Sequence, residues 1–329
     1  MPMYDSTRVY NDPILTNFAV GYRDQALVAP DMFPETPVLI ESGQYRVFDR
    51  SDWLMFDDQR APGASANEVR GAAWSIDNFR TKEHALKVAV TDEEIAQFAR
   101  ASASAATNLV AITPPLTKGT QLVTRAIDLR LENDAQTLVR NLANYPTANK
   151  LVQSSGNKWD NYASSTSDPI TDIVNARRAI RTATGFEPTD VWIPFDVETW
   201  LPRHPKVLSQ FQYVAAVPPI DAVFRAANFQ GTVHIMDSQY NSNDTPAAGE
   251  AMVKFWGKDV IFAYVDPTPG METQTWAKRF SWIFPNGQTT AVARWRDEDR
   301  ESILVRVKKK YDLKIVNSKA AYIIQGAVS

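Results

Sequence analysis

The sequence predicts an α+β protein, with helices and strands grouped in different parts of the chain. Three observations lead to this prediction. Apolar residues recur at helical spacing from Val123 to Leu142. Residues 167–269 combine short apolar strands with helices, and the residues after Gly270 show the period of two that is typical of strands.

The N-terminal stretch, residues 12–34, combines apolar side chains with residues that interrupt regular structure. The interrupting residues in and beside it are Pro13, Gly21, Pro30, Pro34 and Pro37. They should stop any long helix or strand from forming. We therefore expect an extended segment that buries its apolar side chains partly on other copies of the same chain.

Two strands are predicted on either side of a loop of small residues. Tyr45 and Val47 are two residues apart in the stretch 42–49, and residues 79–90 have the composition of a returning strand. Between them, residues 60–71 carry almost no core-forming side chains. Because an isolated two-stranded ribbon is only marginally stable in water, it should lie against another surface.

The longest predicted helix covers about residues 117–143. Its apolar stripe consists of Val123, Ile127, Leu131, Ala135, Leu138 and Leu142. At 1.5 Å per residue, such a helix is about 40 Å long. It is therefore long enough to act as a strut for the whole molecule.

Two other helices have clear boundaries. Thr91 and Glu94 form a capping box at the start of one. Asp168 is the predicted N-cap of the other, with Pro169 at its first position and Gly185 at its end.

The middle of the chain is expected to form one compact α/β unit, residues 167–269. Short strands are predicted at residues 190–194 and 232–236, and two more at residues 251–265 around Gly257. A helix is predicted at residues 220–227.

The C-terminal part is predicted to consist of strands. One face of its longest strand carries Ile303, Val305, Val307, Tyr311, Leu313 and Ile315. Another strand is expected at residues 320–327. The lysines at 308–310 are distributed over both faces of this strand. They could contact DNA or a neighbouring acidic patch, but the favoured prediction is that they lie on a solvated edge of the sheet.

The composition narrows the possible functions. The chain has 329 residues, a net charge of -3 and no cysteine. The charge argues against a dedicated nucleic-acid binder, since phosphate binding requires clustered cations. The missing cysteines exclude disulfides and thiolate chemistry. Neither a signal peptide nor a membrane-spanning apolar run is apparent.

The sequence predicts no catalytic, cofactor-binding or metal-binding residue. The histidines at 84, 204 and 234 are far apart and show no metal-ligand spacing. Acidic groups occur as Asp49 with Asp52, Asp57 with Asp58, and the run Asp297, Glu298 and Asp299. Each is expected in a solvated loop or turn. A two-domain hydrolase that uses one such carboxylate pair stays as a distant alternative.

Six stretches follow one another along nearly the whole chain. They are residues 11–38, 42–49, 60–69, 159–173, 196–208 and 256–270. In order and spacing, they resemble the major capsid proteins of tailed double-stranded-DNA bacteriophages, which have the Hong Kong 97-type fold. The resemblance implies a shell protein and not an enzyme.

The family resemblance implies a domain organisation. It assigns residues 1–40 to an N-terminal arm and residues 41–82 to a hairpin called the E-loop. Residues 83–166 would form a peripheral domain with the spine helix at about 117–143. Residues 167–269 would be the axial domain, and residues 270–329 would complete the peripheral domain.

In this family, the arm and the E-loop lie across adjacent subunits. The residues expected to make such contacts are Ile14, Leu15, Phe18, Tyr22, Leu27, Phe33, Tyr45, Val47 and Arg60. Gly43, Gly63 and Gly71 are hinge candidates, because glycine accepts backbone angles that other residues do not.

The implied function is self-assembly into hexamers and pentamers of an icosahedral shell that encloses packaged phage DNA. The implied partners are other copies of the chain, a separate scaffolding protein and a portal protein, with a decoration protein as a further candidate. DNA would lie loosely and non-specifically against the shell, and no membrane is involved. The implied location is the virion, after assembly in the bacterial cytoplasm.

Two departures and one alternative accompany the resemblance. Some relatives carry a long N-terminal scaffolding segment that is cleaved during maturation, whereas here the arm motif starts almost at Met1, so either a separate scaffolding protein or an already processed chain is expected. Some relatives cross-link an E-loop lysine to a neighbouring asparagine, but residues 43–80 contain no lysine, so no covalent cross-linking is expected. The alternative is an encapsulin-like nanocompartment, which has the same fold and holds protein cargo.

Overall fold

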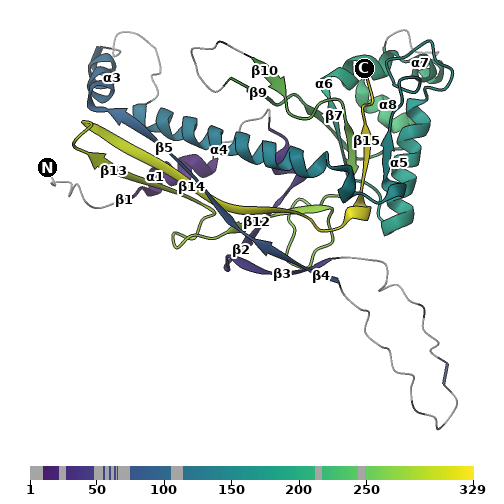
Figure 1. Cartoon of the computed structure of the whole chain (residues 1–329), viewed down its shortest axis with the longest axis horizontal. Coiled ribbons are helices and arrows are strands. Elements are labelled where there is room, and N and C mark those ends of the chain that lie inside the picture. Colours follow the sequence, from purple (N-terminus) through teal and green to yellow (C-terminus); the bar gives the residue numbers. More distant parts are fainter. Residues whose placement is uncertain are drawn as a thin grey trace.

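The structure, a computed structural model, describes residues 10–21, 27–47, 55, 59–60, 63, 65, 75–104, 114–211, 217–243, 249 and 251–329. Its body is elongated (Figure 1). The long helix α4 (Pro115–Val139) crosses a large sheet, and a second α/β unit lies at one end of the body. The predicted α+β class is confirmed.

The large sheet has the strand order β1-β13-β14-β12-β2. β5 pairs with the edge of β14 that does not face β13. These strands are β1 (Tyr10–Asn11), β2 (Glu35–Val38), β5 (Lys82–Thr91), β12 (Ala277–Trp282), β13 (Thr290–Asp297) and β14 (Ser302–Ile315). Only β2 and β12 pair in parallel among them. The long strand β14 is therefore central.

The interpretation of residues 308–310 as a solvated edge is wrong. These lysines lie on β14, which has a partner strand on both sides. Lys309 points to the helix side of the sheet, where its Nζ lies 2.5 Å from Asp128 Oδ1 of α4. The pattern of one strand does not reveal which of its edges are paired, and this caused the error.

Helix α4 packs on the large sheet through its apolar stripe, as predicted. The shared core contains Leu15, Ala19, Val123, Ile127, Val292, Val305 and Val307. The helix ends at Val139, before the expected end at 143, because a new turn begins there. The Asn141 side chain accepts a hydrogen bond from the Ala143 N–H at 3.0 Å and starts this turn.

The N-terminal arm contains a helix that the proline pattern did not predict. Helix α1 spans Pro13–Gly21 and packs against α4 and β13. Asp12 caps it, because its Oδ1 accepts the N–H groups of Ile14 and Leu15 at 2.9 and 3.1 Å. The expectation of a purely extended segment is therefore wrong, since proline in the first turn favours a helix start.

The predicted ribbon is present, but its second strand is divided. β3 (Ser42–Val47) pairs with β4 (Ser75–Arg80), and these two strands are called the ribbon below. The chain is interrupted at Thr81, and β5 then joins the large sheet. The ribbon lies below the sheet, on the side away from α4 (Figure 1).

Two predicted helix starts are confirmed. The Thr91 hydroxyl accepts the Glu94 N–H at 3.3 Å at the start of α3 (Asp92–Ser104). Asp168 accepts the Thr171 N–H at 3.1 Å at the start of α5 (Pro169–Thr184), and Gly185 ends that helix with φ 82°.

The second α/β unit is built on a five-stranded sheet with the order β6-β15-β11-β7-β8. These strands are β6 (Lys150–Val152), β15 (Ala321–Gln325), β11 (Val260–Ala263), β7 (Asp190–Pro194) and β8 (Thr232–Met236). β15 was expected among the peripheral strands, but it lies inside this sheet. The last strand of the chain therefore completes the unit.

Short helices cover this second sheet, and a small strand pair lies beside it (Figure 1). Besides α5, the helices are α6 (Phe195–Trp200), α7 (Pro205–Leu208) and α8 (Ile220–Ala226). The strand pair is β9 (Gln239–Asn241) with β10 (Met252–Lys254). A separate core, which includes Ile173, Phe224 and Phe262, fills the unit.

Candidate assembly interface

The root of the ribbon is packed firmly on the body. Tyr45 and Phe79 are 4% and 1% exposed, and their rings lie 5.3 and 4.5 Å from the ring of Phe280 on β12. The Tyr45 hydroxyl donates to Asp77 Oδ2 at 2.7 Å, and burial with this hydrogen bond raises the Tyr45 pKa. Val47 is half-buried beside them.

The ribbon packs on the face of the large sheet that points away from α4. Side chains alternate between the two faces of a strand. Val305 and Val307 of β14 share a core with α4, so Asp312 lies on the other face. Phe280 is the register partner of Asp312 and shares that face. We call it the ribbon face.

An ionic cluster fastens the ribbon root to β14. Lys310 Nζ lies 2.7 Å from Glu41 Oε1 and 3.6 Å from Glu83 Oε2, and 4.5 Å from the centroid of the Trp282 ring. The Glu41 carboxylate raises the pKa of Lys310. The Thr81 N–H donates to the Glu41 carbonyl at 2.8 Å, which holds the two sides of the root together.

The three hinge candidates differ in their surroundings. A Cβ on Gly43 would lie 2.9 Å from Phe79 Cε1, so close packing requires glycine there. Gly63 has φ +86° and no atom within 4 Å of an added Cβ. Gly71 lies outside the described residues. A hinge role for these glycines stays a prediction.

The arm residues proposed for inter-subunit contacts divide into two groups. Leu15, Leu27 and Phe33 are at most 7% exposed, and they pack in the core of their own chain. In contrast, Ile14 is 78% exposed and Phe18 is half-buried. The unburied apolar surface of the arm is therefore smaller than the sequence implied.

The remaining two contact candidates are less informative. Arg60 is exposed, and Tyr22 lies outside the described residues. An inter-subunit role for the whole set stays a prediction.

A buried carboxylate joins the arm, α4 and the second α/β unit. Glu132 of α4 is fully buried and accepts the N–H groups of Val28 and Ala29 at 3.2 and 2.8 Å. It also accepts from the Ser238 hydroxyl at 2.9 Å and from the Trp256 indole N–H. Burial raises its pKa, and these hydrogen bonds oppose that shift. Glu132 was not among the residues predicted from the sequence, although a charge beside the apolar stripe of a helix was an available signal.

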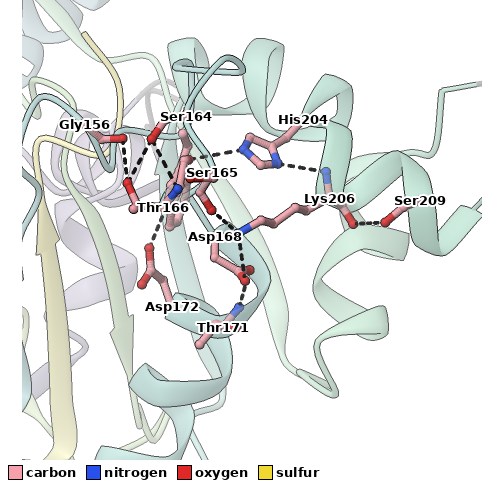
Figure 2. Close-up of polar contacts among 12 residues, drawn as sticks. Gly156, Ser164, Ser165, Thr166, Asp168, Thr171, Asp172, His204, Lys206 and Ser209 are labelled. Carbon is pink, nitrogen blue, oxygen red and sulfur yellow. Dashed lines mark hydrogen bonds and ion pairs between the residues drawn. The ribbon is translucent and has the colours of Figure 1, made fainter.

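A polar network fixes the loop before α5 to α7 (Figure 2). Lys206 Nζ lies 3.2 Å from Asp168 Oδ2 and donates to the Ser165 carbonyl at 3.0 Å. His204 is buried, which lowers its pKa, and its Nδ1 accepts the Lys206 N–H at 3.2 Å. Its Nε2 faces the Ser167 hydroxyl at 3.2 Å.

This serine and histidine are not arranged for nucleophilic catalysis. The Ser167 hydroxyl donates to the Lys158 carbonyl at 2.9 Å, so it accepts from His204 Nε2–H. A general base would need an unprotonated nitrogen facing the hydroxyl. Here the free lone pair of the ring is on Nδ1 and takes a backbone N–H instead. The network therefore has a structural role.

The other two histidines and the acidic groups named above also form no catalytic arrangement within the described residues. His84 stacks on Tyr311, and His234 Nε2 lies 2.7 Å from Asp190 Oδ1. Within the described residues, no group of three or more His, Asp or Glu side chains could hold a metal ion. In the acidic run, Asp297 is the last residue of β13, and Glu298 and Asp299 lie in the turn after it, as expected. The pairs at 49 and 52 and at 57 and 58 lie outside the described residues.

No membrane-spanning segment was predicted from the sequence. Among the described residues, no helix is long and apolar enough to cross a bilayer.

Comparison with known proteins shows similarity over nearly the whole chain. No family model matches it. The major capsid protein of Burkholderia phage BcepMu is 24% identical over 96% of both chains. A phage-related protein from Bordetella bronchiseptica RB50 has a similar structure, with a TM-score of 0.75, 22% identity and 98% coverage of both chains.

A capsid protein with lower sequence identity has the same fold. The capsid structure of cyanophage P-SCSP1u matches with a TM-score of 0.52 and 8% identity, over 93% of this chain and 89% of that one. The predicted resemblance to phage major capsid proteins and the predicted Hong Kong 97-type fold are confirmed.

Proposed function

We propose that this chain is the main shell-forming subunit of a tailed phage. It assembles into hexamers and pentamers of an icosahedral shell around packaged double-stranded DNA, in the cytoplasm of a bacterial host. The observation that carries the proposal is similarity to a major capsid protein over 96% of both chains.

The geometry supports an assembly role for the ribbon. Its root is fixed by Tyr45, Phe79 and the Lys310–Glu41 ion pair, so its direction relative to the body is set. The two strands lie below the large sheet, on the side away from α4 (Figure 1). We propose that the part of the E-loop beyond this fixed root contacts a neighbouring copy. Such a contact adds interface area without enlarging the core of the subunit.

The proposal assigns no catalysis to the chain. Glu298 and Asp299 lie in an exposed turn after β13, and Ser167 and His204 are arranged for structural hydrogen bonds. The proposed partners are further copies of the chain, a separate scaffolding protein and a portal protein, with a decoration protein on assembled shells.

The test is to express the chain alone and with a scaffolding protein from the same genome region. Negative-stain electron microscopy and sucrose-gradient sedimentation then detect closed particles. We expect shells of megadalton size, and shells from infected cells should contain nuclease-protected DNA. A chain that remains a small oligomer under both conditions contradicts the proposal. Particles that contain protein cargo instead of DNA indicate a nanocompartment.

A further inference from the structure

Two cations face each other on the ribbon face, and the described residues supply no counter-ion to either. Lys87 of β5 and Arg306 of β14 are register partners in the antiparallel pair. Arg306 lies on the ribbon face because Val305 and Val307 point to α4. Like charges directly opposite each other destabilise a sheet. Within the described residues, neither cation forms an ion pair with a carboxylate.

The surroundings hold Arg306 in place half-buried, whereas Lys87 is exposed. Arg306 Cζ lies 5.3 Å from the centroid of the Trp295 ring, and the buried Arg306 Nε has no hydrogen-bond partner among the described residues. The neighbour of Arg306 on β13 is Ala293, which is too small to cover a guanidinium. The indole ring thus supports the guanidinium, and the Arg306 side chain stays half-buried.

A third cation extends the positive area. Lys308 lies two residues along β14 on the same face, and its register partners are Ala85 and Ala291. Its Nζ is 3.5 Å from Glu83 Oε1, but Glu83 is shared with Lys310. We call Lys87, Arg306 and Lys308 the cation site. Its charge exceeds that of the single nearby carboxylate.

We propose that the cation site binds carboxylates of the E-loop of a second copy of this chain. The segment 49–58 carries Asp49, Asp52, Asp57 and Asp58 against one arginine, Arg50. This charge complements the cation site. The inference rests on the proposed shell function, and it identifies the side chains that one subunit offers to the E-loop of the next.

The position of the ribbon root supports this occupant. The ribbon packs on the same face of the large sheet as the cation site, through Phe280. In a head-to-tail ring, every copy turns the same face to the same side of the ring. The root of the E-loop of one subunit therefore lies on the same side of the ring as the ribbon face of its neighbour. The net charge of -3 argues against DNA as the occupant.

The proposal predicts opposite effects on subunit stability and on assembly. Neutralising Lys87 removes repulsion within the isolated subunit, so its unfolding midpoint should stay the same or rise. The same change removes attraction to the neighbour, so assembly should weaken. A residue that only maintained the fold would lower the two quantities together.

The experiment uses two sets of neutralising substitutions in the full chain. The first set is Lys87→Gln with Arg306→Gln. The second set is Asp49→Asn, Asp52→Asn, Asp57→Asn and Asp58→Asn. A third protein combines both sets, and Lys118→Gln, at an exposed position of α4, is the control. Lys87→Gln alone is the second variant if the change at Arg306 impairs folding.

The protein concentration at half-maximal assembly is measured by sedimentation, together with the urea unfolding midpoint of unassembled subunits. We expect about a fivefold or larger increase in that concentration for each set, and little further increase in the combination. The control should assemble like the wild type, and added NaCl should reduce the difference between wild type and variants.

Several outcomes overturn the proposal. Unchanged assembly of both sets, or fully additive effects in the combination, means that the two charge groups do not meet. Normal shells that retain less DNA after the Lys87 and Arg306 changes identify DNA as the partner. If the wild-type chain forms no particles at all, the proposed shell function itself fails. Normal wild-type shells with unaffected variants overturn this inference alone.

Discussion

The Ala29 N–H donates to the Glu132 carboxylate across 2.8 Å, which ties the arm to the middle of α4. Trp256 and Ser238 reach the same carboxylate from the second α/β unit. A single buried side chain therefore connects three parts of the fold that are distant in sequence. The arm is fixed to its own subunit at this point.

Replacing Glu132 with leucine should strongly destabilise the subunit. The change leaves buried donors without an acceptor, including the N–H groups of Val28 and Ala29. We expect the free energy of unfolding to fall by about 3 kcal/mol or more, measured by urea denaturation. Glu93→Leu, at an exposed position of α3, should change it by less than about 0.5 kcal/mol. Equal effects would contradict this role of Glu132.

Two adjacent arm residues should affect different properties. Leu15→Ala removes a side chain from the core and should cost the subunit about 2–4 kcal/mol in calorimetric stability. Ile14→Ser changes a side chain that is 78% exposed, so the melting temperature should hardly change. Its effect should appear in particle yield, because the proposed partner of Ile14 is another copy. A yield equal to that of the wild type would remove Ile14 from the interface.

Gly43→Ala should loosen the ribbon root. The new methyl group would lie 2.9 Å from Phe79 and Ile40. To relieve this overlap, the ribbon has to move away from Phe280. We expect a loss of about 1–3 kcal/mol and faster amide hydrogen exchange in β3 and β4. Gly21→Ala is the matched control, since no atom lies within 4 Å of its added Cβ. Unchanged exchange in the Gly43 variant would show that the packing adjusts without cost.

Lys278 should make stability depend on alkaline pH. It is fully buried, its Nζ donates to the Gly270 and Met271 carbonyls, and burial lowers its pKa from 10.5 to about 8. Between these pH values, the unfolded chain binds more protons at this group than the folded chain. The contribution of Lys278 to the free energy of unfolding therefore rises with pH across this window.

The Lys278 prediction is tested by measuring the free energy of unfolding in urea at several pH values from about 7.5 to about 10.5. This range includes the pKa of Lys278 in the folded and in the unfolded chain. Lys278→Met should lack the rise that the wild type shows. Lys118→Met, at an exposed position, should keep it. Parallel pH curves for the wild type and Lys278→Met would contradict the prediction.

Assembled shells should dissociate completely into single chains in denaturant. Residues 43–80 contain no lysine, so this hairpin cannot supply an amine for an isopeptide bond. A boiled sample on a denaturing gel should show one band near 36.8 kDa. A ladder of multimers would show covalent linkage through another part of the chain.

Local signals predicted elements correctly where the structure is decided locally. Helix α5 begins after Asp168, with Pro169 as its first residue, and ends at Gly185, as expected. Capping could be predicted because it needs only neighbouring residues. The same rules, applied to Asp12 and Pro13, would have predicted α1. That helix was missed because the prolines were interpreted as breakers only.

The sequence by itself determined the fold class, the long helix, the paired ribbon and the likeness to capsid proteins. Periodicity and capping depend on residues close along the chain, and family likeness depends on their order. Only the tertiary structure decided that Leu27 and Phe33 are buried in their own subunit and that Lys87 stands opposite Arg306. Burial and cross-strand register depend on residues brought together from distant parts of the chain, and no local pattern encodes those contacts.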